Sequence, residues 1–270
     1  MYNMSTISEV PRDQQSTHNP WPMAVITVLG VAAAIAMAYL GSGALVGDQV
    51  SEAAGGALSA DATPLAPAST AFGIWAVIYL GLAAYAIWQL TPTARASQRQ
   101  RALRPWAIAS AVLNAVWLFT VQLEALWLSV LVIVVLLAVL IRILYILGRP
   151  HSGAVEMVLT DGTFGLYFGW VLAATFANTW ATFAAEGVTV FEEIPLGLVG
   201  VVVAAAVAVT AAVLNGGRLA PALATSWGLA WIAVARTEGE FADTTLVWTA
   251  AAAAAVVLVA AIGRRVTTRS

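Results

Sequence analysis

The sequence predicts an all-α integral membrane protein with eight transmembrane helices. Of its 270 residues, 61% are hydrophobic and only 10% are charged, whereas a soluble domain carries about 25% charged residues. Apolar runs of about 20 residues recur along the chain, and this is the length that a helix needs to cross the hydrocarbon core of a bilayer. The mean hydropathy of +0.86 agrees with this class.

The predicted helices follow these apolar runs in order. Residues 1–20 are polar and rich in Ser, Thr, Asn and Gln, so we expect a disordered cytoplasmic tail there. The third and fourth runs are separated only by a tight turn around Glu124, which predicts an antiparallel hairpin. The fifth run is long enough to tilt, and the seventh is short. The helices are expected at 22–42, 70–90, 105–123, 125–146, 155–183, 194–214, 219–236 and 244–263.

The distribution of arginine supplies an independent argument for this topology. The chain has no lysine, and all twelve basic residues are arginines. With eight spans and a cytoplasmic N-terminus, every arginine except Arg236 falls on the inner side, as the positive-inside rule requires. We therefore expect both termini in the cytoplasm, and the asymmetry favours a bacterial cytoplasmic membrane.

Several classes of function are excluded by composition. Cysteine is absent, which excludes disulfides and thiol catalysis, and the lack of lysine excludes a retinal Schiff base. His18 and His151 lie outside the apolar runs, so no imidazole is expected to hold a metal within the membrane. We find no nucleophilic triad, phosphate loop or nucleic-acid patch. The sequence thus predicts no catalytic residue, no metal site and no required cofactor, and it favours a protein that is not an enzyme.

Aromatic and amide side chains share faces on three predicted helices, all in the outer half of the membrane. Such a cluster is typical of an apolar pocket with a few polar groups. The alternative is that the asparagines only join helices, that Trp75 belongs to the interfacial belt, and that the small residues allow tight packing. The stripes are Trp75 and Tyr79, then Asn114 and Trp117, then Trp170, Ala174 and Asn178.

The long loop over 41–70 is rich in Gly, Ala and Ser and lies at the outer ends of the helices. It is either a flexible linker or a lid over the pocket. At the inner side, Glu156 and Asp161 are candidate intramembrane acids. If the fifth helix begins near Gly162, which we favour, both are interfacial and pair with Arg142 or Arg149.

Three motifs occur in order along the chain. Pro67 precedes W-x-x-x-Y at 75–79, L-N-A-V-W follows at 113–117, and Y-F-G-W-V-L-A-A-T-F-A-N follows at 167–178. This order resembles the TspO/translocator protein family, the tryptophan-rich sensory proteins, over about residues 21–186. The sequence departs from that family at Ser69, where a Trp is usual, at Leu166, where a Pro is usual, and in lacking the sterol motif after the fifth helix.

The resemblance implies a five-helix unit at 21–186 whose outer-half cavity binds tetrapyrroles or other flat hydrophobic molecules. Three further helices at 187–270 would then be a membrane extension. The implied function is a receptor, sensor or carrier, and the implied partners are a hydrophobic small molecule, membrane lipids and, as an open alternative, a second copy of the chain. The implied ligand-binding residues are Trp75, Tyr79, Asn114, Trp117, Tyr167, Trp170, Ala174 and Asn178.

Two other functions remain open from the sequence. The first is a proton-coupled secondary transporter that uses Asp161 or Glu156 as a relay. The second is light-dependent degradation of a bound porphyrin, with Trp75 and Trp170 as redox groups. Trp227 and Trp231, one turn apart on the seventh helix, are equally consistent with packing and with ligand contact.

Overall fold

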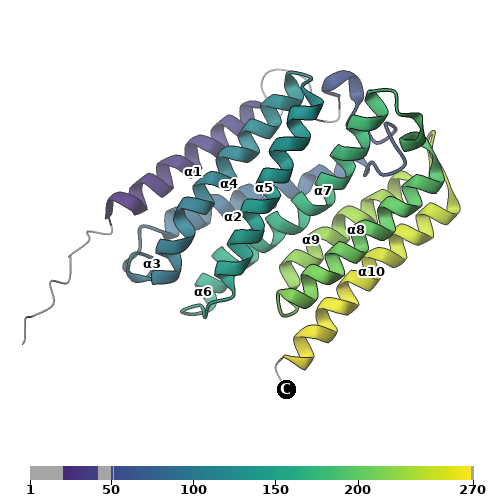
Figure 1. Ribbon diagram of the computed structural model, residues 1–270. Helices are drawn as coiled ribbons and strands as arrows, with labels where there is room; N and C mark the ends of the chain where they lie inside the picture. The colour runs from purple at the N-terminus through teal and green to yellow at the C-terminus, as the bar shows by residue number, and fades with distance from the viewer. Residues whose placement is uncertain (1–20, 42–49, 51, 269–270) are drawn as a thin grey trace, which may run out of the picture.

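The computed structural model describes residues 21–41, 50 and 52–268, and every regular element in these ranges is helical (Figure 1). The predicted tail at 1–20 and the loop residues 42–49 and 51 lie outside the described residues. The long helices are α1 (Trp21–Gly41), α2 (Ile74–Trp88), α4 (Gln98–Gln122), α5 (Leu126–Leu147), α7 (Thr163–Ala185), α8 (Ile194–Leu214), α9 (Leu219–Ala235) and α10 (Thr244–Thr267). Shorter elements are η1 (Ala54–Gly56), η2 (Ser69–Gly73), α3 (Pro92–Ala96), α6 (Ala154–Glu156), η3 (Met157–Gly162) and η4 (Thr189–Glu192).

The helical membrane architecture predicted from the sequence is confirmed. Within the described ranges, seven helical segments are long and apolar enough to cross a membrane, and the shorter apolar helix α9 has 17 residues. Large apolar side chains such as Leu80, Leu131 and Val259 are exposed on the outside of the bundle. A soluble protein rarely exposes so much contiguous apolar surface, whereas lipid solvates it without cost.

Neighbouring helices pack side by side to form one bundle (Figure 1). α4 packs between α1 and α5, α7 packs against α5 and α2, and α9 packs between α7 and α10. Alternating helix directions give the bundle two distinct ends. We call the end with residues 52–73 and the α4–α5 turn the loop end. We call the end with α3, α6, the α8–α9 turn and the end of α10 the arginine-rich end (Figure 1).

The third predicted helix begins earlier than its apolar run. Residues 105–123 were expected, but α4 begins at Gln98 and continues through Pro105. The additional turns carry Arg99 and Arg104, which are buried and donate hydrogen bonds to other segments. The hydropathy of the sequence predicts that the helix starts after these arginines, because it treats each charge as unpaired. Partners in the folded chain remove that penalty.

The turn between α4 and α5 is as tight as predicted, and the two helices form an antiparallel hairpin. Glu124 adopts a left-handed backbone conformation with φ of 57°. The amide of Ala125 then donates to the carbonyl of Thr120 at 2.9 Å, which closes the end of α4. Such conformations are uncommon for residues other than glycine.

Helix α9 lies very close to α7 because small residues face each other. A Cβ atom added at Gly169 would lie 2.1 Å from the carbonyl oxygen of Pro221, and one at Gly228 would lie 2.7 Å from Cβ of Ala173. Close approach through small residues replaces hydrophobic driving force in helix packing within lipid. This contact joins α9 to the helices that carry the three motifs.

Candidate functional site

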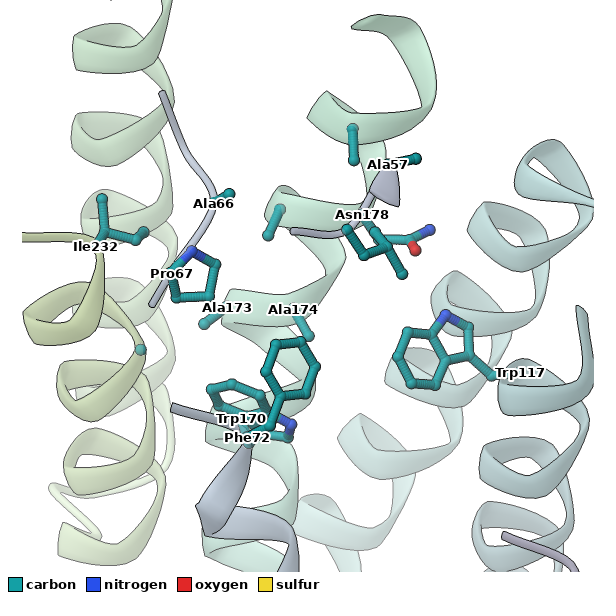
Figure 2. Close-up of a pocket in the computed structure, with 14 residues that line it drawn as sticks. Ala57, Ala66, Pro67, Phe72, Trp117, Trp170, Ala173, Ala174, Asn178 and Ile232 are labelled. Carbon is teal, nitrogen blue, oxygen red and sulfur yellow. The ribbon is translucent and has the colours of Figure 1, made fainter. Parts of the chain in front are cut away.

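An apolar cavity of about 40 Å³ lies between α4, α7 and α9 at the loop end (Figure 2). Figure 2 shows Trp117 of α4 on one side, Ile232 of α9 on the other, and the face of α7 between them. The chain that precedes α2 covers the remaining side of the cavity. Its lining residues are Ala57, Leu58, Ala66, Pro67, Phe72, Trp117, Trp170, Ala173, Ala174, Ala177, Asn178, Ala181, Gly228 and Ile232.

Four of the eight residues predicted to bind ligand line this cavity. They are Trp117, Trp170, Ala174 and Asn178. The three from α7 follow the i, i+4, i+8 spacing of one helix face, and the neighbouring small residues keep the wall smooth. Asn178 also exchanges hydrogen bonds with the hydroxyl of Ser129 on α5, at 3.0 and 3.3 Å, so it joins two helices as well.

The other four predicted residues form an aromatic layer next to the cavity. Trp75 stacks on Tyr79 with 5.3 Å between ring centroids, and it meets Tyr167 and Trp170 edge-on at 5.7 and 6.4 Å. Asn114 donates a hydrogen bond of 2.9 Å to the Tyr79 hydroxyl. The Tyr167 hydroxyl in turn donates to a carbonyl of α4 at 2.8 Å. This layer supports Trp170, which lines the cavity itself.

Buried polar atoms without partners occur beside the cavity. Nε1 of Trp117, Nε1 of Trp170 and Oδ1 of Asn114 are buried and have no hydrogen-bond partner among the described residues. Leaving a buried donor or acceptor unsatisfied costs about 1–3 kcal/mol. Trp117 and Trp170 line the cavity, so their two indole donors belong to its walls, whereas Asn114 lies in the aromatic layer and does not line the cavity.

The described part of the long loop forms a lid over the cavity. We define the lid as residues 57–72, because Leu58, Ala66, Pro67 and Phe72 all line the cavity. Phe72 meets Trp170 edge-on with 5.6 Å between ring centroids (Figure 2). Of the two interpretations that the sequence left open, the lid geometry is the one that the described residues adopt.

Arg236 holds the lid in place from the end of α9. Its side chain is only 1% exposed. The guanidinium donates to the carbonyl of Thr63 at 3.1 Å, to that of Ala60, and to that of Ala66 at 3.5 Å. Burial lowers the pKa of Arg236, and the carboxylate of Asp61 partly offsets this effect. An arginine remains charged at neutral pH even so.

The two tryptophans of α9 also hold the chain around the lid. Nε1 of Trp227 donates to the carbonyl of Ala71 at 3.0 Å, and the amide of Ala68 donates to the carbonyl of Trp231 at 3.1 Å. The cavity lining includes neither ring. The Trp227 side chain therefore anchors the chain before α2, whereas Trp231 does so only through its backbone carbonyl. Trp227 also lines a separate hollow between α2, α7 and α9.

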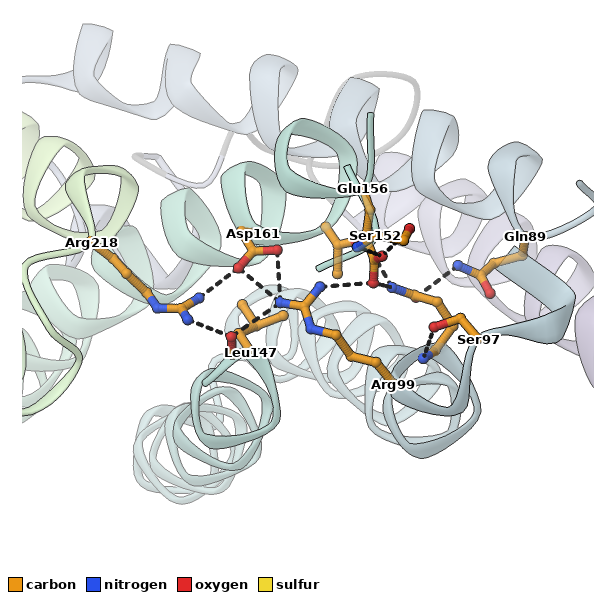
Figure 3. Close-up of polar contacts among 10 residues, drawn as sticks. Gln89, Ser97, Arg99, Leu147, Ser152, Glu156, Asp161 and Arg218 are labelled. Carbon is orange, nitrogen blue, oxygen red and sulfur yellow. Dashed lines mark hydrogen bonds and ion pairs between the residues drawn. The ribbon is translucent and has the colours of Figure 1, made fainter. Parts of the chain in front are cut away.

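A buried polar network lies at the arginine-rich end (Figure 3). Arg99 pairs with Glu156 at 2.9 Å and with Asp161 at 2.8 Å, and Arg218 pairs with Asp161 at 2.6 Å. The predicted partners, Arg142 and Arg149, were wrong. The ion pairs instead join α4 to the start of the α6–α7 segment, and that segment to Arg218 at the start of α9. Arg99 is one of the residues that the hydropathy of the sequence placed before the third predicted helix.

A π-helical turn explains how both acids reach one arginine. The helical segment begins at Ala154, not near Gly162 as favoured from the sequence, and residues 157–162 form the π turn. Glu156 and Asp161 are five residues apart, which would place them about 140° apart around an α-helix. In a π turn, residues five apart are hydrogen-bonded neighbours one turn apart. Both carboxylates therefore face Arg99.

Several cavity residues were missed from the sequence. The lid residues Leu58 and Phe72 and the α9 residues Gly228 and Ile232 carry no pattern that separates them from ordinary apolar positions. Arg236 did carry a signal, because it is the one arginine that the predicted topology places on the outer side. A charge that breaks the positive-inside pattern was thus a marker of a buried structural role.

Comparison with known proteins gives one match. The family model described as TSPO-like protein matches residues 24–263, a range that includes α8 and α9 and almost all of α10. No curated protein and no solved structure matches the chain. The resemblance predicted from the three motifs is confirmed, and the chain belongs to the TSPO-like protein family.

Proposed function

We propose that this membrane protein binds a flat hydrophobic molecule, of the tetrapyrrole class, in the cavity beneath the lid, as a receptor, sensor or carrier. Family membership supports a membrane binding protein in general. The observation that carries the finer proposal is an apolar cavity bordered by two indole N–H groups that lack partners. Aromatic faces stack on a macrocycle, and the free donors suit its polar edge.

The size of the cavity adds a mechanical requirement to this proposal. Pockets for drug-sized ligands measure about 300–1,000 Å³, whereas this one measures about 40 Å³. A tetrapyrrole therefore needs the lid to move outward before it can enter. We propose that the lid residues Leu58, Pro67 and Phe72 withdraw while the walls on α4 and α7 remain in place. Binding would then select an open state.

The test is a titration of protoporphyrin IX against the purified protein, followed by the porphyrin's own absorbance. Replacing Trp117 and Trp170 by Phe keeps aromatic walls but removes both free donors, and each lost bond is worth about fivefold in affinity. A matched control is Trp248→Phe, because Trp248 lies on α10 and is 70% exposed. Binding that is absent, or equally tight in all variants, would contradict the proposal.

The transporter alternative gains no support from the geometry of the acids. Glu156 and Asp161 both accept hydrogen bonds from Arg99, and such pairing is the usual arrangement of a structural network. Substrate flux that depends on pH and is lost in Asp161→Asn would restore that alternative. Light- and oxygen-dependent loss of porphyrin, sensitive to Trp75→Phe, would identify the degradative alternative.

We also propose an orientation in a bacterial cytoplasmic membrane with the arginine-rich end in the cytoplasm. The proposal rests on the positive-inside rule. Arg236, the exception, is buried against the lid and so is not a free charge in a loop. The described arginines at the proposed inner end are Arg95, Arg99, Arg101, Arg104, Arg142, Arg149, Arg218, Arg264 and Arg265.

A further inference from the structure

A second hollow lies at the arginine-rich end, far along the bundle from the lid. This cleft of about 390 Å³ separates the end of α5 from the turn between α8 and α9. It is lined on one side by Leu144, Tyr145 and Arg149, and on the other by Leu214, Asn215 and Arg218. Polar and apolar groups therefore occur together at a helix end.

The cleft carries an excess of positive charge. Arg149 forms no ion pair in the part of the chain that the structure describes. Arg218 pairs with Asp161, but Arg99 shares that carboxylate (Figure 3). Arg264 donates to the carbonyl of Val213 at 3.3 Å, next to the same turn. Glu156 and Asp161 together balance Arg99 and Arg218, so the excess charge in the cleft lining comes from Arg149, for which an anion is a suitable partner.

A buried donor without a partner adds specific evidence for a ligand. The side-chain oxygen of Asn215 accepts a hydrogen bond of 2.9 Å from the amide of Arg218. That bond fixes the orientation of the Asn215 amide. Its Nδ2 is buried and has no hydrogen-bond partner among the described residues. Because Asn215 lines the cleft, a phosphate oxygen bound there is a candidate partner for this donor.

The apolar part of the cleft indicates which kind of anion fits. Leu214 is 82% exposed and Tyr145 is 73% exposed, directly beside the basic groups. A free phosphate would leave these side chains uncovered, whereas a phospholipid covers them with its glycerol and acyl region. Basic pockets between helices at a membrane face are typical sites for anionic headgroups.

We propose that this cleft binds the phosphate headgroup of an anionic phospholipid. Arg149, Arg218 and Nδ2 of Asn215 contact the phosphate, while Leu214 and Tyr145 contact the apolar part of the lipid. Because Arg218 also pairs with Asp161 and donates to the carbonyl of Leu147, the bound lipid reinforces the contact between α5 and the α8–α9 turn.

The test is native mass spectrometry of the full chain in detergent with added phosphatidylglycerol, compared with phosphatidylcholine. We expect preferential retention of phosphatidylglycerol, reduced about fivefold in Arg149→Gln. Asn215→Asp should weaken it further, because this change keeps the oxygen that accepts from Arg218 and replaces the free donor with a negative charge. Arg149 is exposed, so its loss should leave thermal unfolding unchanged in detergent without added lipid.

The control is Arg101→Gln, which removes an exposed arginine outside the cleft. Equal retention of the two lipids would overturn the proposal, as would a preference that Arg149→Gln, Asn215→Asp and Arg101→Gln change equally. Glycerol 3-phosphate is added as a separate competitor. If it displaces phosphatidylglycerol at equal concentration, the cleft is a site for free phosphate esters and the lipid assignment fails.

Discussion

Removing the guanidinium of Arg236 should free the lid. Arg236→Met keeps an unbranched apolar stem but deletes the donors to Ala60, Thr63 and Ala66. A hydrogen bond from a charged donor contributes about 1.5–3 kcal/mol net. If only the bonds to Ala60 and Thr63 are counted, at about 1.5 kcal/mol each, the closed lid loses about 3 kcal/mol of stability relative to the open lid.

A loss of about 3 kcal/mol raises the ratio of open to closed lid about 100-fold, since 1.4 kcal/mol corresponds to a factor of ten. Hydrogen exchange of the amides in residues 57–68 should accelerate by that factor. If ligand enters only the open state, the association rate of protoporphyrin IX should rise in parallel. Stopped-flow absorbance measures that rate, and Arg101→Met, at the opposite end, is the control.

Two outcomes would refute this reasoning at different points. Unchanged hydrogen exchange in Arg236→Met would show that the carbonyl contacts do not hold the lid closed. Faster exchange without faster association would show that the lid does hold but is not the route by which ligand enters. The second outcome would leave the cavity intact as a site and redirect attention to entry between the helices.

Two further predictions concern stability in detergent. Gly169→Ala places a methyl group 2.1 Å from the carbonyl oxygen of Pro221, so it should cost about 1–3 kcal/mol of stability and lower the Tm by several degrees. In the control Gly263→Ala, the added methyl group meets nothing within 4 Å. An equal effect of the two changes would exclude steric conflict as the cause. Arg99→Met leaves two carboxylates without this partner and should cost about 3–5 kcal/mol, measured by chemical unfolding. Arg101→Met, an exposed change on the same helix, should cost much less; equal losses would show that the buried network contributes nothing specific.

Much of the fold was predictable because its causes are local. Apolar runs of sufficient length specify where helices cross, and the tight turn at Glu124 was visible as a single polar interruption between two of them. The early start of α4 was not predictable, because the cost of Arg99 and Arg104 depends on partners far away in the chain. Hydropathy sums residues one at a time and has no term for such pairs.

The candidate site, like the fold, was predictable from the sequence only in part. Trp117, Trp170, Ala174 and Asn178 were placed on shared faces by helical spacing alone, and they do line the cavity. The lid contacts of Arg236 were not predictable, because they join segments 170 or more residues apart. The division of the chain into residues 21–186 and 187–270 stays a prediction, although α9 contributes both a cavity wall and the lid contacts.

The sequence by itself determined that this is a helical membrane protein, which apolar runs form its helices and which family its motifs match. The tertiary structure decided which faces meet, how small the closed cavity is, and which arginine holds each acid. The physical reason is that most of these helices are apolar around their whole circumference. Such helices have no amphipathic stripe to fix their rotation, so only side-chain contacts, small residues and the π turn at 157–162 determine how they face one another.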